Sequence, residues 1–397
     1  MDFRFSEAEE QYRDEVRAWL GRNIPDWWLE VGDREVGEDD DLFPKLREWH
    51  HKLYDAGYVG ATWPVEYGGQ GRGHVENALL QEELVRANAP PTQNGLGIGL
   101  CGPAIIHHGT EEQKQRFLRP MLRAEEMWCQ GYSEPAAGSD LANVQTRAIL
   151  EGDHYVVNGQ KIWTSAAHLA DWTFCLVRSD PDAAKHDGIG FLLIDMKTPG
   201  IEIAPLVQIT GGTNFSQVFY KDVRVPRENM IGGPTEGWRV ANTVLGYERG
   251  ASTLSRYAMY KRHLDQLVDL AQRSRRGGGP ASRDPVTRQG IAQLAIDAEV
   301  LRLNSLRSLT ALAQGHKPGA ESSTQKLYYS EFQARLARFG NDLTGAYGQL
   351  ARSEGRAADR GRWSARELAS RGPLIFAGTS EIQRNIISER VLGLPRR

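Results

Sequence analysis

The period of the apolar residues changes twice along this 397-residue chain, and this change limits the possible folds more than any other feature. From Ser6 to about Arg123, apolar residues recur at helix spacing, as in "EEQYRDEVRAWL". From about Trp128 to Gly233, β-branched and aromatic stretches alternate with Gly, Pro and Asp turns. Long helical segments then return, with the content of an antiparallel bundle. We expect an α+β protein with an N-terminal helical domain (1–125), a middle β domain (126–235) and a C-terminal helical bundle (236–397).

Two shorter signals add detail to this prediction. Asn158-Gly159, inside "HYVVNGQKIWTS", is typical of a tight β-hairpin turn. The stretch "RSRRGGGPASRDP" interrupts the C-terminal helices, and Gly277 to Pro280 predict a flexible, basic loop. Thr110, which precedes "EEQKQRFLRPML", is expected to cap a helix.

Composition and charge exclude several classes of function. Apolar residues make up 40% and charged residues 25%, and the formal net charge is −3, so nothing favours nucleic acid or a membrane surface as a partner. No apolar run is long enough to span a bilayer, and the first four residues do not begin a signal peptide. Cys101, Cys129 and Cys175 form no C-x-x-C pair, so we expect small core residues in a reduced, cytoplasmic compartment.

Two further patterns do not support a site. Gly97 to Gly102 satisfy G-x-G-x-x-G, but no strand precedes them and Pro103 follows, so close packing of helices is favoured over a dinucleotide fold. The pairs His50-His51 and His107-His108 cannot chelate a metal well, because neighbouring residues on a helix point in different directions. We predict no metal site and expect solvated or core-edge histidines.

Two segments of the middle block carry polar groups suited to a ligand. The segment "WCQGYSEPAAGSDLANVQTRA" offers small residues and the hydroxyls of Ser133, Ser139 and Thr146, where a polar ring or a phosphate can dock. It is followed by "GQKIWTSAAHLADW".

Together these segments resemble the flavin-binding signatures of the acyl-CoA dehydrogenase family. The resemblance extends over essentially the whole chain, through "GTEEQKQRFL", "DVRVPRENMIG" and "GTSEIQRNIISERVLG". It implies an acyl-CoA dehydrogenase-like fold, with a barrel or sandwich in the middle and a four-helix bundle at the end. It also implies FAD as the cofactor.

The resemblance assigns roles to individual residues. Gln130, Tyr132 and Ser133 are expected to line the isoalloxazine. Trp163, Thr164 and Ser165 are expected to cover its other edge, with Ser165 near the reactive nitrogen; the alternative for Trp163 is a place in the sheet core. Ser139 is expected to contact the acyl-CoA. Further cofactor contacts are expected from Gln289, Gly378, Thr379, Ser380 and Glu381.

Two departures from the family pattern stand out. Ala136 replaces a usual glycine. The glycine loop replaces an Arg-x-x-Phe-Gly element that reaches a neighbouring subunit's flavin diphosphate in the family. That role is therefore left to one of four arginines or to none: Arg273, Arg275, Arg276 and Arg283.

The catalytic base is the central question. Removing the α-proton of a thioester needs a positioned base and a polarised carbonyl. Many members place a glutamate where this chain has Ala377, which keeps only the backbone N–H that the resemblance assigns to the thioester carbonyl. Some members that act on branched chains carry the glutamate on the first bundle helix, before an arginine, as Glu248-Arg249 stand here.

The local pattern agrees with an inward Glu248. Val240, Val244 and Glu248 follow helix spacing, and burial would raise the pKa of a carboxyl on that stripe. The alternative is a boundary glutamate paired with an arginine. Glu381 is the rival carboxylate, but Ser380 and Gln383 have capping-box spacing, so an acid there is explained by a helix start.

The resemblance therefore implies an enzyme, an FAD-dependent acyl-CoA dehydrogenase. Glu248 would take the α-proton while the β-hydride passes to flavin N5, giving a trans-2-enoyl-CoA. Expected partners are an acyl-CoA substrate, an electron-transfer flavoprotein and other subunits of a homotetramer or heterotetramer. Two alternatives remain open: a non-catalytic partner subunit of a mixed tetramer, and an oxygen-using flavoenzyme on the same fold.

Overall fold

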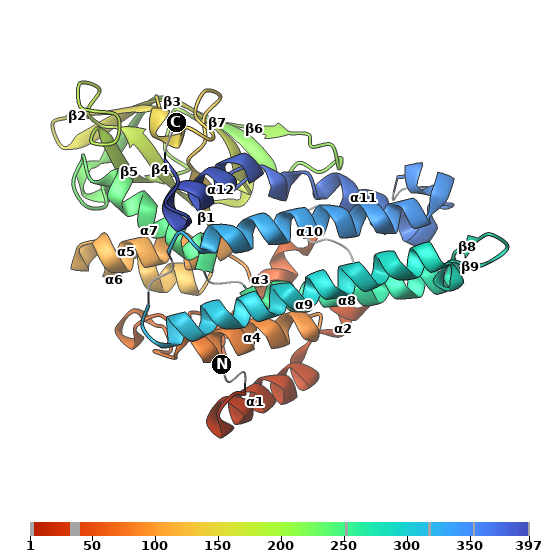
Figure 1. Ribbon diagram of the computed structural model, residues 1–397. Coiled ribbons are helices and arrows are strands. Elements are labelled where there is room, and N and C mark those ends of the chain that lie inside the picture. Colours follow the sequence, from red (N-terminus) through yellow and green to blue (C-terminus); the bar gives the residue numbers. More distant parts are fainter. Residues whose placement is uncertain (1–3, 32–39, 251–252, 317–318, 352–353, 396–397) are drawn as a thin grey trace. The chain divides into compact units, whose positions relative to one another are not determined.

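The computed structural model describes residues 4–31, 40–250, 253–316, 319–351 and 354–395 (Figure 1). Contacts divide the chain into two compact units, and neither is continuous in sequence. The sheet unit comprises Ile24–Gly73 and Pro90–Glu248, and the bundle unit comprises Met1–Asn23, His74–Ala89 and Arg249–Arg397. The boundaries of the three expected domains remain a prediction.

A curled seven-stranded sheet forms the centre of the sheet unit (Figure 1). Its strands are β1 (Trp128–Gly131), β2 (Arg147–Glu151), β3 (His154–Ser165), β4 (Trp172–Arg178), β5 (Ile189–Asp195), β6 (Ile201–Leu206) and β7 (Phe215–Pro226). The order is β1-β4-β2-β3-β7-β6, and β5 pairs with β4. The β-branched stretches seen in the sequence supply the core, which includes Val157, Val177 and Val218 at 0% exposure.

Helices in the same unit precede and follow the sheet. They are α2 (Asp26–Val31), α3 (Phe43–Asp55), α5 (Gly102–His108), α6 (Glu111–Leu122) and α7 (Gly237–Gly250). Thr110 caps α6 as predicted: its hydroxyl accepts the N–H of Gln113 at 3.3 Å, and the Gln113 side chain accepts the N–H of Thr110 at 2.8 Å.

Long helices form the bundle unit. They are α1 (Glu7–Asn23), α4 (His74–Arg86), α8 (Thr253–Arg273), α9 (Pro285–Ala313), α10 (Ser322–Leu343), α11 (Arg362–Ala369) and α12 (Ser380–Ile386). Helices α8, α9 and α10 lie side by side, as Figure 1 shows. Tyr260, Leu301 and Phe332 come from these three helices and meet in one buried cluster. The expected α+β class and the helical, β and helical succession along the chain are confirmed.

The hairpin predicted at Asn158-Gly159 is wrong. β3 runs straight through these residues, and the chain turns instead at Gly152 and Asp153, between β2 and β3. Gly159 marks a bulge in β3, where a Cβ would lie 2.6 Å from the Cα of Thr146. Asn158 exchanges hydrogen bonds of 3.0 and 2.9 Å with Asp222 of β7. Close approach of a neighbouring segment, and not a turn, explains the glycine.

Other sequence features have clear structural outcomes. The segment expected as a loop carries two short paired strands, β8 (Arg275–Arg276) and β9 (Gly279–Pro280). Gly97–Cys101 form a π-helical turn, and a Cβ on Gly102 would lie 2.0 Å from Cζ2 of Trp63, so close packing explains this motif. All three cysteines are free and buried, and burial raises the pKa of Cys129 to about 12. Within the described ranges, no helix is long and apolar enough to cross a membrane.

Candidate active site

Two sequence-predicted flavin segments lie next to each other in the sheet unit. Gln130 belongs to β1, Tyr132 and Ser133 follow it, and Trp163–Ser165 end β3. The N–H of Ile162 donates to the carbonyl of Ser133 at 2.9 Å, which joins the two segments directly. The structure therefore brings together the residues from 130 to 133 and from 163 to 165.

Trp163 stands on a strained, exposed bulge. The pairing of β3 with β7 shifts register between Lys161 and Thr164, and Trp163 has a φ of 61°. Its side chain is 56% exposed and touches Phe215 edge-on, with ring centroids 6.0 Å apart. This exposure excludes the alternative that Trp163 belongs to the sheet core. Left-handed backbone at a non-glycine residue concentrates at functional sites.

Thr164 carries a buried hydroxyl beside that exposed ring. It is 1% exposed, and no described residue forms a hydrogen bond with its Oγ1. Unpaired buried hydroxyls are uncommon because desolvation without a partner costs free energy. The group is therefore suited to a ligand that brings its own hydrogen-bonding atom. Ser165 is half-buried, whereas Ser139 is exposed on the loop after Ala136.

Sequence reasoning missed a buried ion pair beneath these segments. Lys161 is 0% exposed, and its Nζ lies 2.7 Å from Oε1 of Glu134. Both residues belong to the two flavin-type segments, and a lysine at an inward position of a strand pattern was the available signal.

A second group of predicted residues lies in the bundle unit, around the turn before α12. Ala377 and Gly378 have φ values of 54° and 89°. Lys326 of α10 holds this turn, with its Nζ 2.8 Å from the Pro373 carbonyl and 2.6 Å from the Gly378 carbonyl. The side-chain amide of Gln383 donates to the Ala377 carbonyl at 2.8 Å. Within the described part of the chain, no group accepts a hydrogen bond from the Ala377 N–H.

The cap of α12 differs from the sequence prediction. Thr379, and not Ser380, is the N-cap, and its hydroxyl accepts the N–H of Ile382 at 3.2 Å. With Thr379 as the N-cap, the third helical residue is Ile382, so Gln383 is one position too far along for a capping box; its side-chain amide donates to the Ala377 carbonyl instead. Ser380 is 7% exposed, and its Oγ has no partner among the described residues. The pKa of Glu381 is lowered by its own backbone N–H and by Thr379, as expected of an acid at a helix start.

The proposed base lies at the end of α7. Val240 and Val244 are 0% exposed, so this helix buries the face on which the sequence pattern places position 248. The backbone of α7 continues to Gly250, but the side chains of Glu248 and Arg249 lie outside the described residues. His108 of α5 anchors the helix through Nε2, 2.8 Å from Oγ1 of Thr243.

The remaining candidates stand on the surface of the bundle unit. Gln289 is exposed in the second turn of α9, and the four arginines proposed for a diphosphate are exposed as well. Arg273 lies 3.5 Å from Asp359, and Arg276 lies 4.0 Å from Asp284. These weak contacts do not distinguish one arginine from the others.

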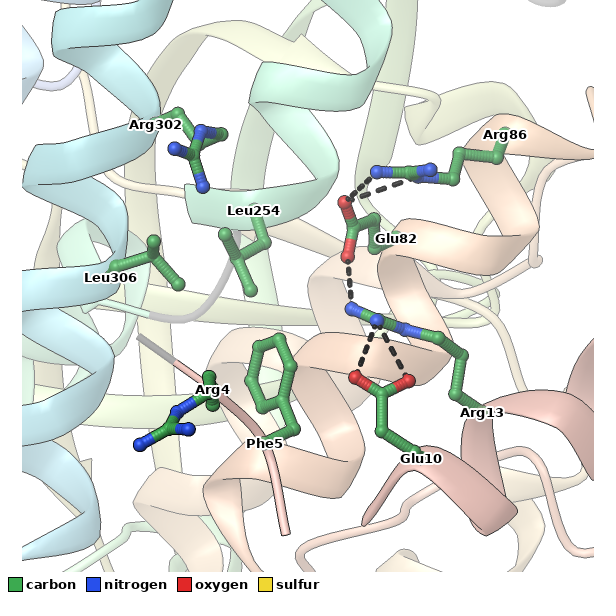
Figure 2. Close-up of a pocket in the computed structure, with 9 residues that line it drawn as sticks. All are labelled: Arg4, Phe5, Glu10, Arg13, Glu82, Arg86, Leu254, Arg302 and Leu306. Carbon is green, nitrogen blue, oxygen red and sulfur yellow. Dashed lines mark hydrogen bonds and ion pairs between the residues drawn. The ribbon is translucent and has the colours of Figure 1, made fainter. Parts of the chain in front are cut away.

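A cavity of about 510 Å³ in the bundle unit contains none of the predicted site residues. Figure 2 shows its lining: Arg4, Phe5, Glu10, Arg13, Glu82, Arg86, Leu254, Arg302 and Leu306. Glu82 bridges Arg13 at 3.2 Å and Arg86 at 2.7 Å, and Arg13 also contacts Glu10. The two carboxylates that line the cavity, those of Glu10 and Glu82, are held in ion pairs, so neither is available as a base.

Among the paired histidines, His50 has a structural role. His50 is buried, with Nε2 2.8 Å from the Leu122 carbonyl and Nδ1 3.2 Å from the Gln93 N–H. Across the described ranges, no group of three or more His, Cys, Asp or Glu residues is placed to hold a metal ion.

The residues present fit FAD, the cofactor implied by the sequence. The exposed indole of Trp163 can cover a planar ring, and the buried hydroxyl of Thr164 can form a hydrogen bond with a polar atom of the ligand. The turn at Ala377 and Gly378 is held with its carbonyls turned toward Lys326 and Gln383.

Comparisons with known proteins support the same family. The chain matches the acyl-CoA dehydrogenase N-terminal domain over residues 6–125, the middle domain over 129–223 and the C-terminal domain over 235–392. It is 39% identical to acyl-CoA dehydrogenase IpdE1 of Mycobacterium tuberculosis, over 98% of each chain.

Solved structures agree. The ChsE4-ChsE5 complex from Mycobacterium tuberculosis matches with a TM-score of 0.86 and 31% identity, over 100% of both chains. The steroid ACAD Tcur3481-Tcur3483 matches with a TM-score of 0.85 and 30% identity, also over 100% of both. Both the sequence identity and the full-length coverage are high enough to assign the family. The chain therefore belongs to the acyl-CoA dehydrogenase family and is an FAD-dependent oxidoreductase.

Proposed function

We propose that this enzyme dehydrogenates an acyl-CoA thioester between Cα and Cβ to a trans-2-enoyl-CoA and passes the electrons to an electron-transfer flavoprotein. The observation that best supports this proposal is the exposed Trp163 at the junction of two flavin-type segments. Beside it lies the buried hydroxyl of Thr164, which has no hydrogen-bond partner in the described part of the chain. Bound FAD supplies the hydride-accepting chemistry, and the protein supplies orientation and electrostatics.

Residues of the chain supply the base and the group that polarises the thioester carbonyl. Glu248 is the base that takes the α-proton, since Ala377 has no carboxylate. The N–H of Ala377 donates to the thioester carbonyl as negative charge develops, and Lys326 and Gln383 keep that turn in place.

Binding roles follow the sequence assignments. Ser139 and Arg249 contact the substrate. The FAD contacts come from Gln130, Tyr132, Ser133, Trp163, Thr164, Ser165, Gln289, Gly378, Thr379, Ser380 and Glu381.

We assign the substrate to bulky acyl chains, including steroid-derived ones, and the assembly to a tetramer, either uniform or mixed. Relatives named as a steroid ACAD and as a two-component ChsE4-ChsE5 complex support this choice. A panel of CoA thioesters, read by bleaching of the oxidised flavin absorbance, tests the substrate class. Preference for a straight short chain would contradict it.

A Glu248→Gln variant tests the base. We expect it to keep its FAD absorbance and to lose at least about a hundredfold in the rate of dye reduction, because a general base contributes at least that much. Glu236→Gln, just before the same helix, is the control and should keep its rate; Glu236 is 46% exposed and can still accept the Gly233 N–H as glutamine. Turnover of Glu248→Gln at the wild-type rate would disprove the assignment.

Oxygen is the competing electron acceptor. We expect dye or flavoprotein reduction without matching peroxide, measured with a peroxidase-coupled assay. Peroxide formed in step with enoyl-CoA would instead make this chain an oxidase.

A further inference from the structure

A buried ion pair lies beneath both flavin segments of the sheet unit. Lys161 is 0% and Glu134 is 6% exposed, and their Nζ and Oε1 atoms are 2.7 Å apart. Removing two charges from water is costly, and apolar residues of similar volume often stabilise a core as well or better. Packing alone therefore does not explain why a charged pair occupies this position.

The polar atoms of the pair connect three segments, and two of these segments bear predicted flavin contacts. Lys161 Nζ also donates to the carbonyl of Tyr132 at 3.1 Å. Glu134 accepts the backbone N–H of Gln145 at 2.6 Å and that of Thr146 at 3.0 Å. One carboxylate and one ammonium thus join the end of β1, the segment before β2 and the end of β3.

The carboxylate of the pair stays ionised around neutral pH. Burial opposes ionisation of Glu134, but the charge of Lys161 and the hydrogen bonds from Lys161, Gln145 and Thr146 outweigh it and lower the pKa of the carboxyl. The ionised form holds all of these donors at once.

The pair lies directly before the bulge that carries Trp163. Lys161 is the last residue of β3 in regular register with β7, opposite Val218, before the shift that ends at Thr164. Two residues after Lys161, Trp163 takes its left-handed conformation. Ser133, one residue before Glu134, is held to Ile162, one residue after Lys161, by the backbone bond of 2.9 Å.

We propose that the Glu134–Lys161 pair positions the flavin by setting the separation and orientation of the segments at 130–133 and 163–165. Both residues are positioning residues, because they act through Tyr132, Ser133, Trp163 and Thr164. This role rests on the proposed function of those segments as the FAD site.

Titration of the apoprotein with FAD tests the role, with flavin fluorescence giving the dissociation constant and visible circular dichroism reporting the environment of the ring. Lys161→Met and Glu134→Gln should each raise the FAD dissociation constant at least tenfold and change the circular dichroism. The double variant should raise it by less than the product of the two single effects, because no unpaired charge stays buried. Lys197→Met removes the exposed Lys197–Asp171 pair of the same unit, 2.8 Å long, and should change neither quantity.

Each outcome decides the proposal. Unchanged FAD affinity and circular dichroism in both single variants, even with a lower melting temperature, would overturn it. If Lys161→Met fails to fold, Glu134→Gln, which keeps the shape of the side chain, decides by the same two measurements. If wild type binds FAD but no acyl-CoA bleaches it, the proposed function fails, while the variants still decide the positioning role.

Discussion

His50 shows how one buried side chain makes stability depend on pH. Gln93 donates its N–H to Nδ1, so the neutral ring donates from Nε2 to the Leu122 carbonyl. Burial, opposed in part by the Leu122 hydrogen bond, lowers the pKa of His50 from 6.5 to about 4. The unfolded chain therefore takes up a proton at this residue at a higher pH than the folded protein does.

We expect His50 to contribute stability at neutral pH that is lost as the pH falls from about 6.5 toward about 4. A shift of this size corresponds to at most about 3 kcal/mol. His50→Gln can still donate to Leu122 but does not titrate, so its free energy of unfolding should vary less between pH 7 and pH 4. Urea unfolding at several pH values measures the difference. His316→Gln, an exposed control, should follow wild type, and parallel pH profiles of His50→Gln and wild type would contradict the prediction.

Two glycines of the G-x-G-x-x-G stretch differ in how closely neighbouring atoms pack against them. A Cβ on Gly102 would lie 2.0 Å from the Trp63 ring, whereas a Cβ on Gly99 meets nothing within 4 Å. Gly102→Ala should therefore lower the free energy of unfolding by about 1–3 kcal/mol through overpacking. Gly99→Ala should leave it unchanged or raise it by up to about 1 kcal/mol, since alanine favours helix. Equal effects in chemical denaturation would refute the packing explanation.

At the scale of elements, α1 is attached to α4 by buried carboxylates. Arg17 binds Glu83 through two bonds of 3.1 and 3.0 Å, and the Glu83 side chain is 4% exposed. Arg13 reaches Glu82 at 3.2 Å. A buried carboxylate that loses its partners is destabilising, so these contacts fix the place of the first helix.

Glu83→Gln should loosen α1 and lower the free energy of unfolding by about 2 kcal/mol, less than for a fully buried pair because Arg17 is 54% exposed. Compared with wild type, the variant should show faster hydrogen exchange in α1, while exchange in α9 should change less. Asp14→Asn removes the exposed partner of Arg17 and should have little effect. Unchanged protection of α1 in Glu83→Gln would contradict this account.

The elements also show where sequence patterns succeed. Thr110 was correctly predicted as the cap of α6, because the cap and the N–H that it accepts are only three residues apart in the chain. The cap of α12 was predicted one residue too late, because Ser380 and Gln383 have capping-box spacing whereas the helix begins after Thr379. Asn158-Gly159 was misinterpreted as a turn because the close approach of Thr146 comes from a segment that precedes it by more than ten residues.

For the whole molecule, bound FAD should stabilise the folded protein. A ligand at 100 times its dissociation constant raises the free energy of unfolding by about 2.7 kcal/mol if it binds only the folded state. We expect a higher melting temperature with added FAD in differential scanning calorimetry of the apoprotein. Riboflavin, which lacks the diphosphate and adenosine, should raise it less at equal concentration. No shift with FAD would contradict the cofactor assignment to these residues.

The sequence by itself determined the α+β class, the family and the cofactor, and it predicted the segments proposed to carry the site. It could do so because helix and strand periods, caps and family motifs are local in the chain. Only the tertiary structure decided that Trp163 is exposed, that the buried Thr164 hydroxyl has no partner among the described residues, and that Lys161 and Glu134 form one pair. Burial and ion pairing depend on which distant segments pack together, and no local pattern specifies that.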